Sequence, residues 1–363
     1  MLRARRRPKC SVPGNVSIEQ VMTLTPAWSP DRRIDGPGSR WPTYQLFGLS
    51  LASDFPFKAR LTPTENPADL SFRLVREAPF EEIDRGDPIY VSRFLTDKGD
   101  SVASLYRLEG YLLFDFTEVG VFYLFPHQIV LHPRNLDRDH LVETYLLGAV
   151  LSLWLESRGM AVLHGSGVVL REGAVGFLSA SGGGKSCLTA SLLRLGWPLL
   201  CDGILSLERR GSQVFVRSGY PQMRLWPQEA EHFLGGRLDL EPVALDQPKL
   251  RVPVAAGGFG SFCPEVTALA GLYLLDRREK TQEVPELEIE PIAPREAVIE
   301  LLKESFTPAL AEALGRQQQR IDFFSGLTSK VPVRRLTYPS SLELLPLVCR
   351  RVGDDVRSSG RRH

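Results

Sequence analysis

The fold is decided by the stretch Ala174-Val175-Gly176-Phe177-Leu178-Ser179-Ala180-Ser181-Gly182-Gly183-Gly184-Lys185-Ser186. Its apolar residues predict a strand, its glycines predict a tight loop, and the run Leu188–Leu195 that follows predicts a helix. Glycines let successive backbone N–H groups turn toward one point, where the N-terminus of the helix adds partial positive charge. This arrangement can hold the phosphates of a nucleotide without crowding from side chains.

The pattern assigns a role to each residue of the loop. We expect Lys185 to reach the β- and γ-phosphates and the Ser186 hydroxyl to ligate Mg²⁺. The predicted nucleotide contacts are Ser181, Gly182, Gly183, Gly184, Lys185, Ser186 and Cys187. The strict pattern G-x-x-x-x-G-K-[S/T] is broken at its first glycine, where this chain has Ser179. A serine with an extended backbone fits there, whereas one held at positive φ costs roughly 1–3 kcal/mol.

The alternative interpretation of this stretch is a glycine-rich turn that happens to carry Lys-Ser. The surrounding pattern argues against it, because a strand precedes the loop, a helix follows it, and a second apolar strand, Leu199–Cys201, ends in Asp202. We therefore keep the nucleotide-binding interpretation.

Composition limits the class of protein. The 363 residues suffice for about two domains of roughly 150 residues each. Hydrophobic residues make up 43% and charged residues 24%, as in globular proteins, and a net charge of +1 gives no electrostatic reason to expect nucleic acid as a partner. The five cysteines, at positions 10, 187, 201, 263 and 349, are scattered and odd in number. This favours reduced thiols and a cytoplasmic location over disulfides or a zinc site.

No apolar run approaches the about 18 residues that a membrane-spanning helix needs, so no membrane association is expected. The longest candidate, Leu141–Leu155, contains Glu143 and has charged flanks, which is typical of a core helix. The basic N-terminus lacks the apolar stretch of about 7–15 residues found in secretory signals. A transit peptide stays open, but a disordered tail or an over-long start is the favoured interpretation.

Five segments are expected along the chain: a disordered tail (1–40), a β-rich domain (41–137), a connecting helix (138–158), a nucleotide-binding domain (159–350) and a second disordered tail (351–363). The β-rich part contains short aromatic and β-branched runs between turn signals, which predict an antiparallel sheet. These runs are Tyr44–Leu51, Leu70–Val75, Ile89–Phe94, Val102–Arg107, Tyr111–Phe116, Val119–Phe125 and Gln128–Leu131. Further on we expect a loop at Ser218–Pro227 and helices at Pro294–Gly315, Gln318–Ser329 and Ser341–Arg351.

Asp202 is the candidate catalytic carboxylate. It ends an apolar strand shortly after the loop helix, so its side chain is expected to face the crevice that holds the phosphates. Two roles fit: it can hold hydrated Mg²⁺ together with Ser186, or it can accept the proton of an attacking hydroxyl. The plainer alternative is a solvent-facing turn residue or a helix cap.

His164 is a second candidate, because it precedes a glycine at a predicted strand end just upstream of the loop strand. A histidine beside the γ-phosphate can stabilise charge or position Asp202. Taken by itself, it is more often a structural histidine with its hydrogen bonds satisfied. Arg224, Lys249 and Arg251 can each neutralise phosphate charge, although each is more often an ordinary surface cation.

Three motifs in this order resemble a known family. Leu163-His164-Gly165, then Ser181–Ser186, then Gly196 before Leu199–Asp202 resemble the catalytic domain of the HPr kinase/phosphorylase family. They resemble more closely its smaller relatives, the HPr-kinase-like serine kinases found beside peptide-modification genes. The segment Gly219–Pro227 and a β-rich region beginning near Tyr44 are similar as well. The resemblance spans about residues 44–350, with its specific motifs between 163 and 227.

The resemblance implies an α/β P-loop kinase domain of the HPr kinase C-terminal type, preceded by a smaller β-rich domain. It implies an ATP- and Mg²⁺-dependent kinase that phosphorylates a serine of a peptide or small protein, with Lys185, Asp202 and His164 at matching catalytic positions. The family's second carboxylate is absent, because Gly203 stands in its place. Glu208 cannot replace it, since a strand rising about 3.3 Å per residue puts it about 20 Å away.

Two other functions stay open. Gly203 and Ser179 are compatible with a nucleotide-binding scaffold or regulator that has lost catalysis. The same scaffold can also serve as a kinase for a sugar or another metabolite. The sequence leaves the acceptor undetermined and is compatible with a homo-oligomer.

Overall fold

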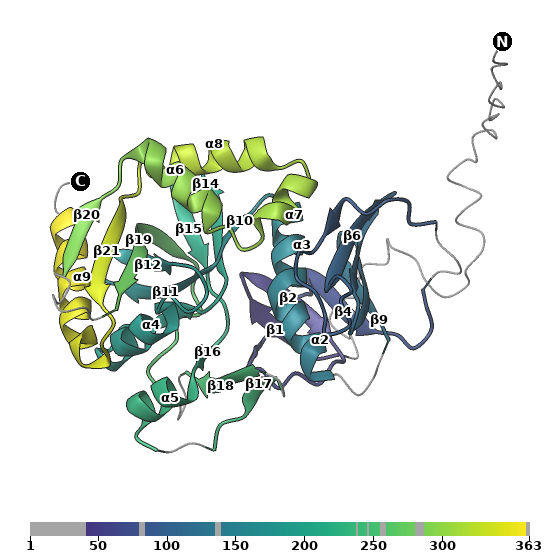
Figure 1. Ribbon diagram of the computed structural model, residues 1–363, viewed down its shortest axis with the longest axis horizontal. Helices are drawn as coiled ribbons and strands as arrows, with labels where there is room; N and C mark the ends of the chain where they lie inside the picture. The colour runs from purple at the N-terminus through teal and green to yellow at the C-terminus, as the bar shows by residue number, and fades with distance from the viewer. Residues whose placement is uncertain are drawn as a thin grey trace, which may run out of the picture.

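The structure is a computed structural model that describes residues 41–79, 84–134, 139–236, 239–244, 247–254, 259–279 and 287–360. The predicted tail at 1–40 and residues 361–363 lie outside the described residues. The architecture is mixed α/β and contains two large β-sheets with a helical segment between them, together with a small third sheet (Figure 1).

The first sheet contains nine strands in the order β3-β1-β2-β4-β9-β8-β7-β6-β5. They are β1 Thr43–Leu46, β2 Leu49–Ser53, β3 Thr62–Pro63, β4 Leu70–Leu74, β5 Tyr90–Val91, β6 Ala103–Leu108, β7 Tyr111–Phe116, β8 Gly120–Leu124 and β9 Gln128–Pro133. The expectation of an all-antiparallel sheet is wrong at its centre, because β4 runs parallel to both β2 and β9. Period-two alternation of apolar residues reports which face is buried but not the direction of the neighbouring strand.

The run Tyr44–Leu51, expected as one strand, is a hairpin. β1 and β2 pair through Leu46 and Leu49, and the two residues between them, Phe47 and Gly48, have φ of 50° and 67°. Positive φ at both central residues is the backbone twist that two-residue hairpins prefer. Phe47 is only 2% exposed and packs edge-on against Tyr220, so this hairpin tip joins the first sheet to the rest of the molecule.

The predicted connecting helix is present as a helical segment that packs on the first sheet. It consists of α2 Asp139–Tyr145, a π-helical turn Leu146–Val150 and α3 Leu151–Ser157. The π-helical turn contains Gly148, whose φ and ψ are both −106°. The apolar face of this segment joins the core of the first sheet, and that core continues into Ile204 and Tyr220 beyond it. The division of the chain into separate domains therefore stays a prediction.

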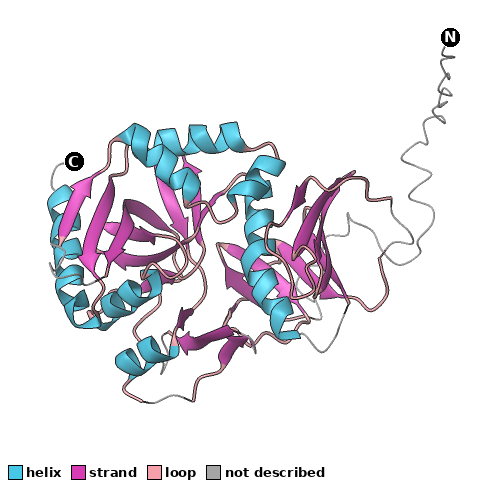
Figure 2. Cartoon of the chain, in the orientation of Figure 1, coloured by secondary structure: helices cyan, strands magenta, loops and turns pink. Residues whose placement is uncertain are grey.

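The second sheet also has nine strands, and its main path runs β10-β14-β15-β19-β12-β11-β13, with β21 pairing with β19 and β20. The strands are β10 Ala161–Leu163, β11 Gly165–Leu170, β12 Gly173–Leu178, β13 Leu199–Cys201, β14 Leu205–Arg210, β15 Gln213–Arg217, β19 Thr267–Arg278, β20 Glu288–Pro291 and β21 Val333–Pro339. Its centre, β12-β19-β21, is parallel. Helices cover both faces (Figure 2), as a parallel sheet requires.

One face of the second sheet packs against α4 Lys185–Arg194 and α9 Leu345–Gly360, and the other packs against α6 Pro294–Lys303 and α8 Gln317–Thr328. The other helices of the described residues are α5 Pro227–Leu234, α7 Pro308–Ala313 and the 3-10 turn Leu342–Leu344. The single helix expected over Pro294–Gly315 is in fact α6 and α7. Between them the chain pairs with β10, because Phe306 N–H donates to the carbonyl of Val162 at 3.0 Å.

Two further expectations are corrected. The segment 351–363 was expected to be a disordered tail, but α9 continues to Gly360. Val348, Val352 and Val356 recur at helical spacing and are buried, and this apolar stripe stabilises the helix despite its charged neighbours. The expected loop Ser218–Pro227 contains β16 Gln222–Leu225, which forms the small third sheet with β17 Pro242–Ala244 and β18 Gln247–Pro253.

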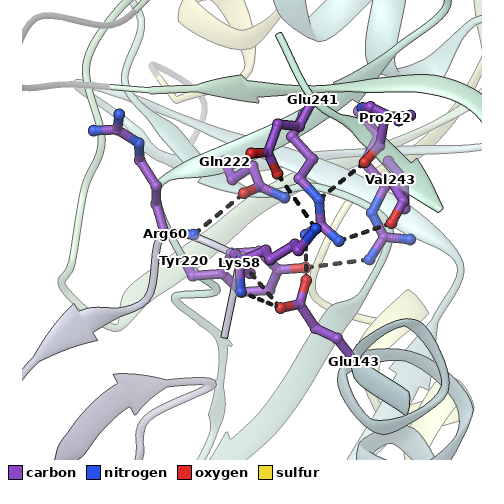
Figure 3. Close-up of polar contacts among 11 residues, drawn as sticks. Lys58, Arg60, Glu143, Tyr220, Gln222, Glu241, Pro242 and Val243 are labelled. Carbon is purple, nitrogen blue, oxygen red and sulfur yellow. Dashed lines mark hydrogen bonds and ion pairs between the residues drawn. The ribbon is translucent and has the colours of Figure 1, made fainter. Parts of the chain in front are cut away.

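A buried polar cluster ties the third sheet to the helical segment and to the loop after β2 (Figure 3). The Glu143 carboxylate, on α2, forms an ion pair with Arg251 of β18 and accepts the N–H groups of Lys58 and Ala59 at 2.6 and 3.0 Å. Glu143 and Arg251 are 3% and 7% exposed. A buried charge of this kind is tolerated only when it is paired and hydrogen-bonded.

Candidate active site

The site forms where three strands of the second sheet meet. β12 ends at the glycine-rich loop, and β13 ends at Cys201, directly before Asp202. Both pair antiparallel with β11, which lies between them, so their ends reach the same edge as the start of β11. His164 directly precedes β11. The topology therefore gathers at one edge residues that lie almost 40 positions apart in the sequence.

Steric limits explain why the loop needs its glycines. Gly182 and Gly184 have φ of 83° and 91°, a left-handed conformation that favours glycine. A Cβ added to Gly183 would lie 2.4 Å from Ser179 Oγ. Ser179 does not have positive φ, because Phe47 alone among the described non-glycine residues does. The serine at the first position of the motif is therefore accommodated without backbone strain.

The loop ends at the N-terminus of α4, with Gly184 as its N-cap. The first amide of this helix to donate to a described carbonyl is that of Leu188, to Gly184 O at 2.9 Å. The preceding amides, those of Lys185, Ser186 and Cys187, have no acceptor among the described residues. Unpaired N–H groups at a helix N-terminus carry partial positive charge and attract anions.

The Lys185 side chain bends back over the loop. Its ammonium donates to the carbonyl of Ser179 at 2.5 Å and to that of Ala180 at 3.1 Å, and the residue is only 7% exposed. Burial lowers the pKa of Lys185 to about 8, although the charges of Asp202 and Glu304 act in the opposite direction. The ammonium is therefore charged at neutral pH.

Asp202 is held by three uncharged donors. Its Oδ1 accepts the Ser166 hydroxyl at 2.6 Å and the Ser186 hydroxyl at 3.0 Å, and its Oδ2 accepts the Arg224 backbone N–H at 2.9 Å. No described cation forms an ion pair with it. The structure thus brings the two predicted Mg²⁺ ligands, Ser186 and Asp202, into direct contact.

His164 lies in the same cavity but does not hydrogen-bond to Asp202. Its Nδ1 lies 3.1 Å from the carbonyl oxygen of Gly203, and because a carbonyl only accepts, Nδ1 carries the proton. Burial, together with the smaller effect of the Lys185 charge, lowers the pKa of His164 to about 4. The imidazole is therefore neutral at pH 7, with Nε2 left as an acceptor. One of the two roles predicted for His164 was to stabilise the charge of the γ-phosphate. A neutral imidazole cannot supply a positive charge for that role at this pH.

One cavity joins these residues. All but one of the predicted site residues line this cavity: His164, Ser181, Gly182, Gly184, Lys185, Ser186, Cys187 and Asp202. Gly183 is the predicted residue that is not part of the cavity wall. Burial raises the pKa of the Cys187 thiol to about 12, so the thiol stays protonated. Arg224 and Lys249 also line the cavity, but Arg251 is instead engaged by Glu143.

Sequence reasoning missed several residues of the site. Ser166 is fully buried on β11, and the only local signal is a hydroxyl between two glycines directly after His164. Trp226 and Glu229 also line the cavity. Trp226 is 42% exposed, and the Lys249 ammonium lies 5.4 Å from the centre of its ring. No local pattern indicates this pair, because Trp226 caps the start of α5, whereas Lys249 lies on β18.

The residues present fit ATP and Mg²⁺. Among the described residues no group of three or more His, Cys, Asp or Glu side chains is placed to hold a metal. Mg²⁺ does not require one, because in phosphate-transfer sites it binds through one or two protein oxygens, the substrate phosphates and water. Asp202 and Ser186 supply such oxygens next to the free amides of α4.

No family model matches the sequence, and no curated protein matches it. Among solved structures, the HPr(Ser) kinase/phosphatase from Coxiella burnetii aligns with a TM-score of 0.27 and 14% identity, over 54% of this chain and 95% of that chain. An alignment of this quality does not establish a shared fold, so family membership stays a prediction from the motifs. Within the described residues, no helix has both the length and the apolar character needed to cross a membrane.

Proposed function

We propose that this protein is an ATP-dependent phosphotransferase that moves the γ-phosphate of ATP to a hydroxyl, most specifically a serine of a peptide or small protein. The observation that carries the proposal is the contact between Ser186 Oγ and Asp202 Oδ1, 3.0 Å apart, at a helix start whose amides are unpaired. An anion-binding surface, a buried ammonium and a carboxylate converge there on one cavity.

Each group has a task in this reaction. The amides of Lys185, Ser186 and Cys187, with the Lys185 ammonium, bind and orient the phosphates. Asp202 and Ser186 would hold Mg²⁺, which would supply charge neutralisation for the phosphates. The acceptor oxygen forms a bond to the γ-phosphorus as the bond to the β–γ bridging oxygen breaks. Asp202 accepts the hydroxyl proton, and ADP leaves.

The wall of the cavity favours a peptide acceptor over a small, fully enclosed metabolite. Its rim carries the exposed Trp226, with Lys249 stacked on it. Such an amphipathic, cationic rim suits an extended polar chain that brings one hydroxyl to the phosphate.

Calorimetry with ATP and Mg²⁺ tests the first requirement of the proposal, which is that the protein binds the nucleotide. We expect measurable binding to the native chain and weaker, still measurable binding to Lys185→Met, because the amides alone are a weaker anion site. Lys303→Met is the matched control, since Lys303 forms only an exposed ion pair with Glu300 on α6. Absence of binding in folded native protein would refute the proposal. If the native protein binds ATP, transfer of the labelled γ-phosphate to serine peptides encoded by neighbouring genes would identify the acceptor.

One observation favours a nucleotide-binding regulator as the second candidate. Gly203, which stands where a second carboxylate is expected, has φ of 89°, and its carbonyl is engaged by His164. A carboxylate residue placed there would adopt a strained backbone. Tight ATP binding without release of the γ-phosphate to any acceptor would favour this regulator.

A further inference from the structure

A separate cavity of about 340 Å³ shares no residue with the candidate active site. Sites for organic ligands usually measure about 300–1,000 Å³, and this cavity falls within that range. Its wall comes from the turn between β6 and β7, the end of β8, the end of α3 and the turn after α7. Figure 1 shows α3 between α7 and the first sheet, so elements that are distant in the sequence meet here.

Buried apolar side chains and exposed arginines form different parts of this wall. Leu124, Phe125 and Trp154 line the cavity and are buried. Arg107 and Arg158 line it as well, and both are exposed. The cavity is therefore an open groove with an apolar floor and a basic rim.

Three arginines of this groove carry charges that no described carboxylate balances. Arg107, Arg158 and the half-buried Arg316 form no ion pair with an Asp or Glu side chain of the described residues. Arg107 donates to a backbone carbonyl at 3.4 Å, and Arg316 donates to a backbone carbonyl at 2.9 Å and to the Gln319 side chain at 3.2 Å. The Arg158 guanidinium lies 5.4 Å from the centre of the Trp154 ring. Neutral partners orient a guanidinium without cancelling its charge, so the groove attracts anions.

We propose that this groove is a docking site for an acidic segment of the peptide acceptor. Carboxylates of that segment pair with the arginines of the rim, and a neighbouring apolar side chain covers the buried floor. The exposed rim suits a chain that continues beyond the groove better than a small, enclosed molecule. The inference rests on the proposed function for the identity of the ligand, but docking itself needs no nucleotide.

Fluorescence anisotropy with a labelled hexapeptide, Glu-Glu-Leu-Phe-Glu-Glu, tests the docking site in the absence of nucleotide. We expect saturable binding to the native protein that weakens as NaCl is raised from about 50 to about 500 mM, because exposed charges are screened by salt. Two control peptides carry Gln in place of each Glu, or Ser in place of Leu and Phe. Each should bind about tenfold more weakly, because each lacks one of the two contacts.

Arg107→Gln combined with Arg158→Gln should weaken binding of the acidic peptide about tenfold, since each exposed charge pair contributes a factor of about two to five. Arg93→Gln is the matched control. Arg93 is exposed and lies over an aromatic ring, as Arg158 does, but it does not line the groove. Because all three arginines are exposed, the variants should keep the native midpoint of thermal unfolding and the native affinity for ATP.

The outcomes separate this inference from the proposed function. Equal binding of the acidic peptide and its Gln counterpart, or native affinity in the double variant, would refute the docking site. Binding of phenylacetate without binding of the peptide would assign the groove to a small organic anion and refute a peptide ligand. If the native protein binds the acidic peptide but not ATP, the proposed function fails and the groove remains a peptide site.

Discussion

Asp202 and Glu143 are two carboxylates that each accept hydrogen bonds from three partners, yet their electrostatic surroundings differ. Glu143 is 3% exposed, and its charge is balanced by the buried guanidinium of Arg251. Asp202 lines a cavity and is held by two hydroxyls and an amide, none of which is charged. The nearby Lys185 ammonium instead donates to loop carbonyls.

The difference shows how one fold neutralises the carboxylate of Glu143 and leaves that of Asp202 available for chemistry. A carboxylate neutralised by a guanidinium has little left to offer a metal or a proton, whereas one positioned by neutral donors keeps its negative charge. The two are also mechanically connected. Arg251 pairs in register with Arg224 across β16 and β18, and the Arg224 amide donates to Asp202. The structural pair thereby helps to place the sheet that orients the candidate catalytic group.

The largest effect should come from removing the free charge of Asp202. Asp202→Asn should reduce γ-phosphate transfer by about 10²–10⁴-fold, because the amide cannot accept the hydroxyl proton. Nucleotide affinity measured without Mg²⁺ should stay near the native value, since the loop amides are untouched. Single-turnover transfer from labelled ATP measures the first quantity, with Asp276→Asn, an exposed partner of Arg278, as control. Native transfer rates in Asp202→Asn would show that this residue is not the base.

Breaking the neutralised pair should mainly affect stability. Arg251→Met leaves the Glu143 charge buried without its cation and should lower the free energy of unfolding by about 3–5 kcal/mol. Adding Glu143→Gln should recover much of that loss, because the amide oxygen still accepts from the loop. Urea denaturation measures both variants. Arg278→Met, which breaks an exposed ion pair, should change the free energy of unfolding very little. An equally small loss in Arg251→Met would contradict the contrast drawn here.

Ser166 tests whether the neutral donors hold Asp202 in place. Ser166→Ala removes a hydrogen bond from a buried hydroxyl to a carboxylate and should cost about 1.5–3 kcal/mol of unfolding free energy, with a parallel drop in transfer rate. Ser152→Ala is the matched control, because the Ser152 hydroxyl on α3 is also buried but has no partner among the described residues. That change should be neutral or stabilising. Equal effects from the two serines would remove any special role for Ser166.

The smallest effect concerns pH. The pKa of Lys185 is lowered to about 8, so the free protein loses this charge as pH rises through 8. Binding of a triphosphate needs the charged form, and its affinity should therefore fall by up to about tenfold per pH unit above pH 8. Calorimetry between pH 7 and pH 10 measures this slope, which should be absent in Lys185→Met. A flat profile in the native chain would show that Lys185 does not contact the phosphates.

The sequence by itself determined the local framework of the site. The loop at 179–184, the helix α4 after it and the strand that ends at Asp202 each follow from short-range patterns, and the structure has all three. Glycines at positive φ and an apolar strand leave the chain few alternatives within a dozen residues. The mixed α/β character follows in the same way from alternating strand and helix periods.

Only the tertiary structure decided which distant groups meet. Ser166 and Asp202 are 36 positions apart, and Glu143 and Arg251 are 108 apart. No local pattern encodes such contacts, since they depend on strand order and direction. For the same reason the sequence missed the parallel pairs around β4 and the extension of α9, whose buried valines need α4 and the second sheet as partners. Periodicity reports which face of an element is apolar; packing alone selects what that face, and any polar group on it, will contact.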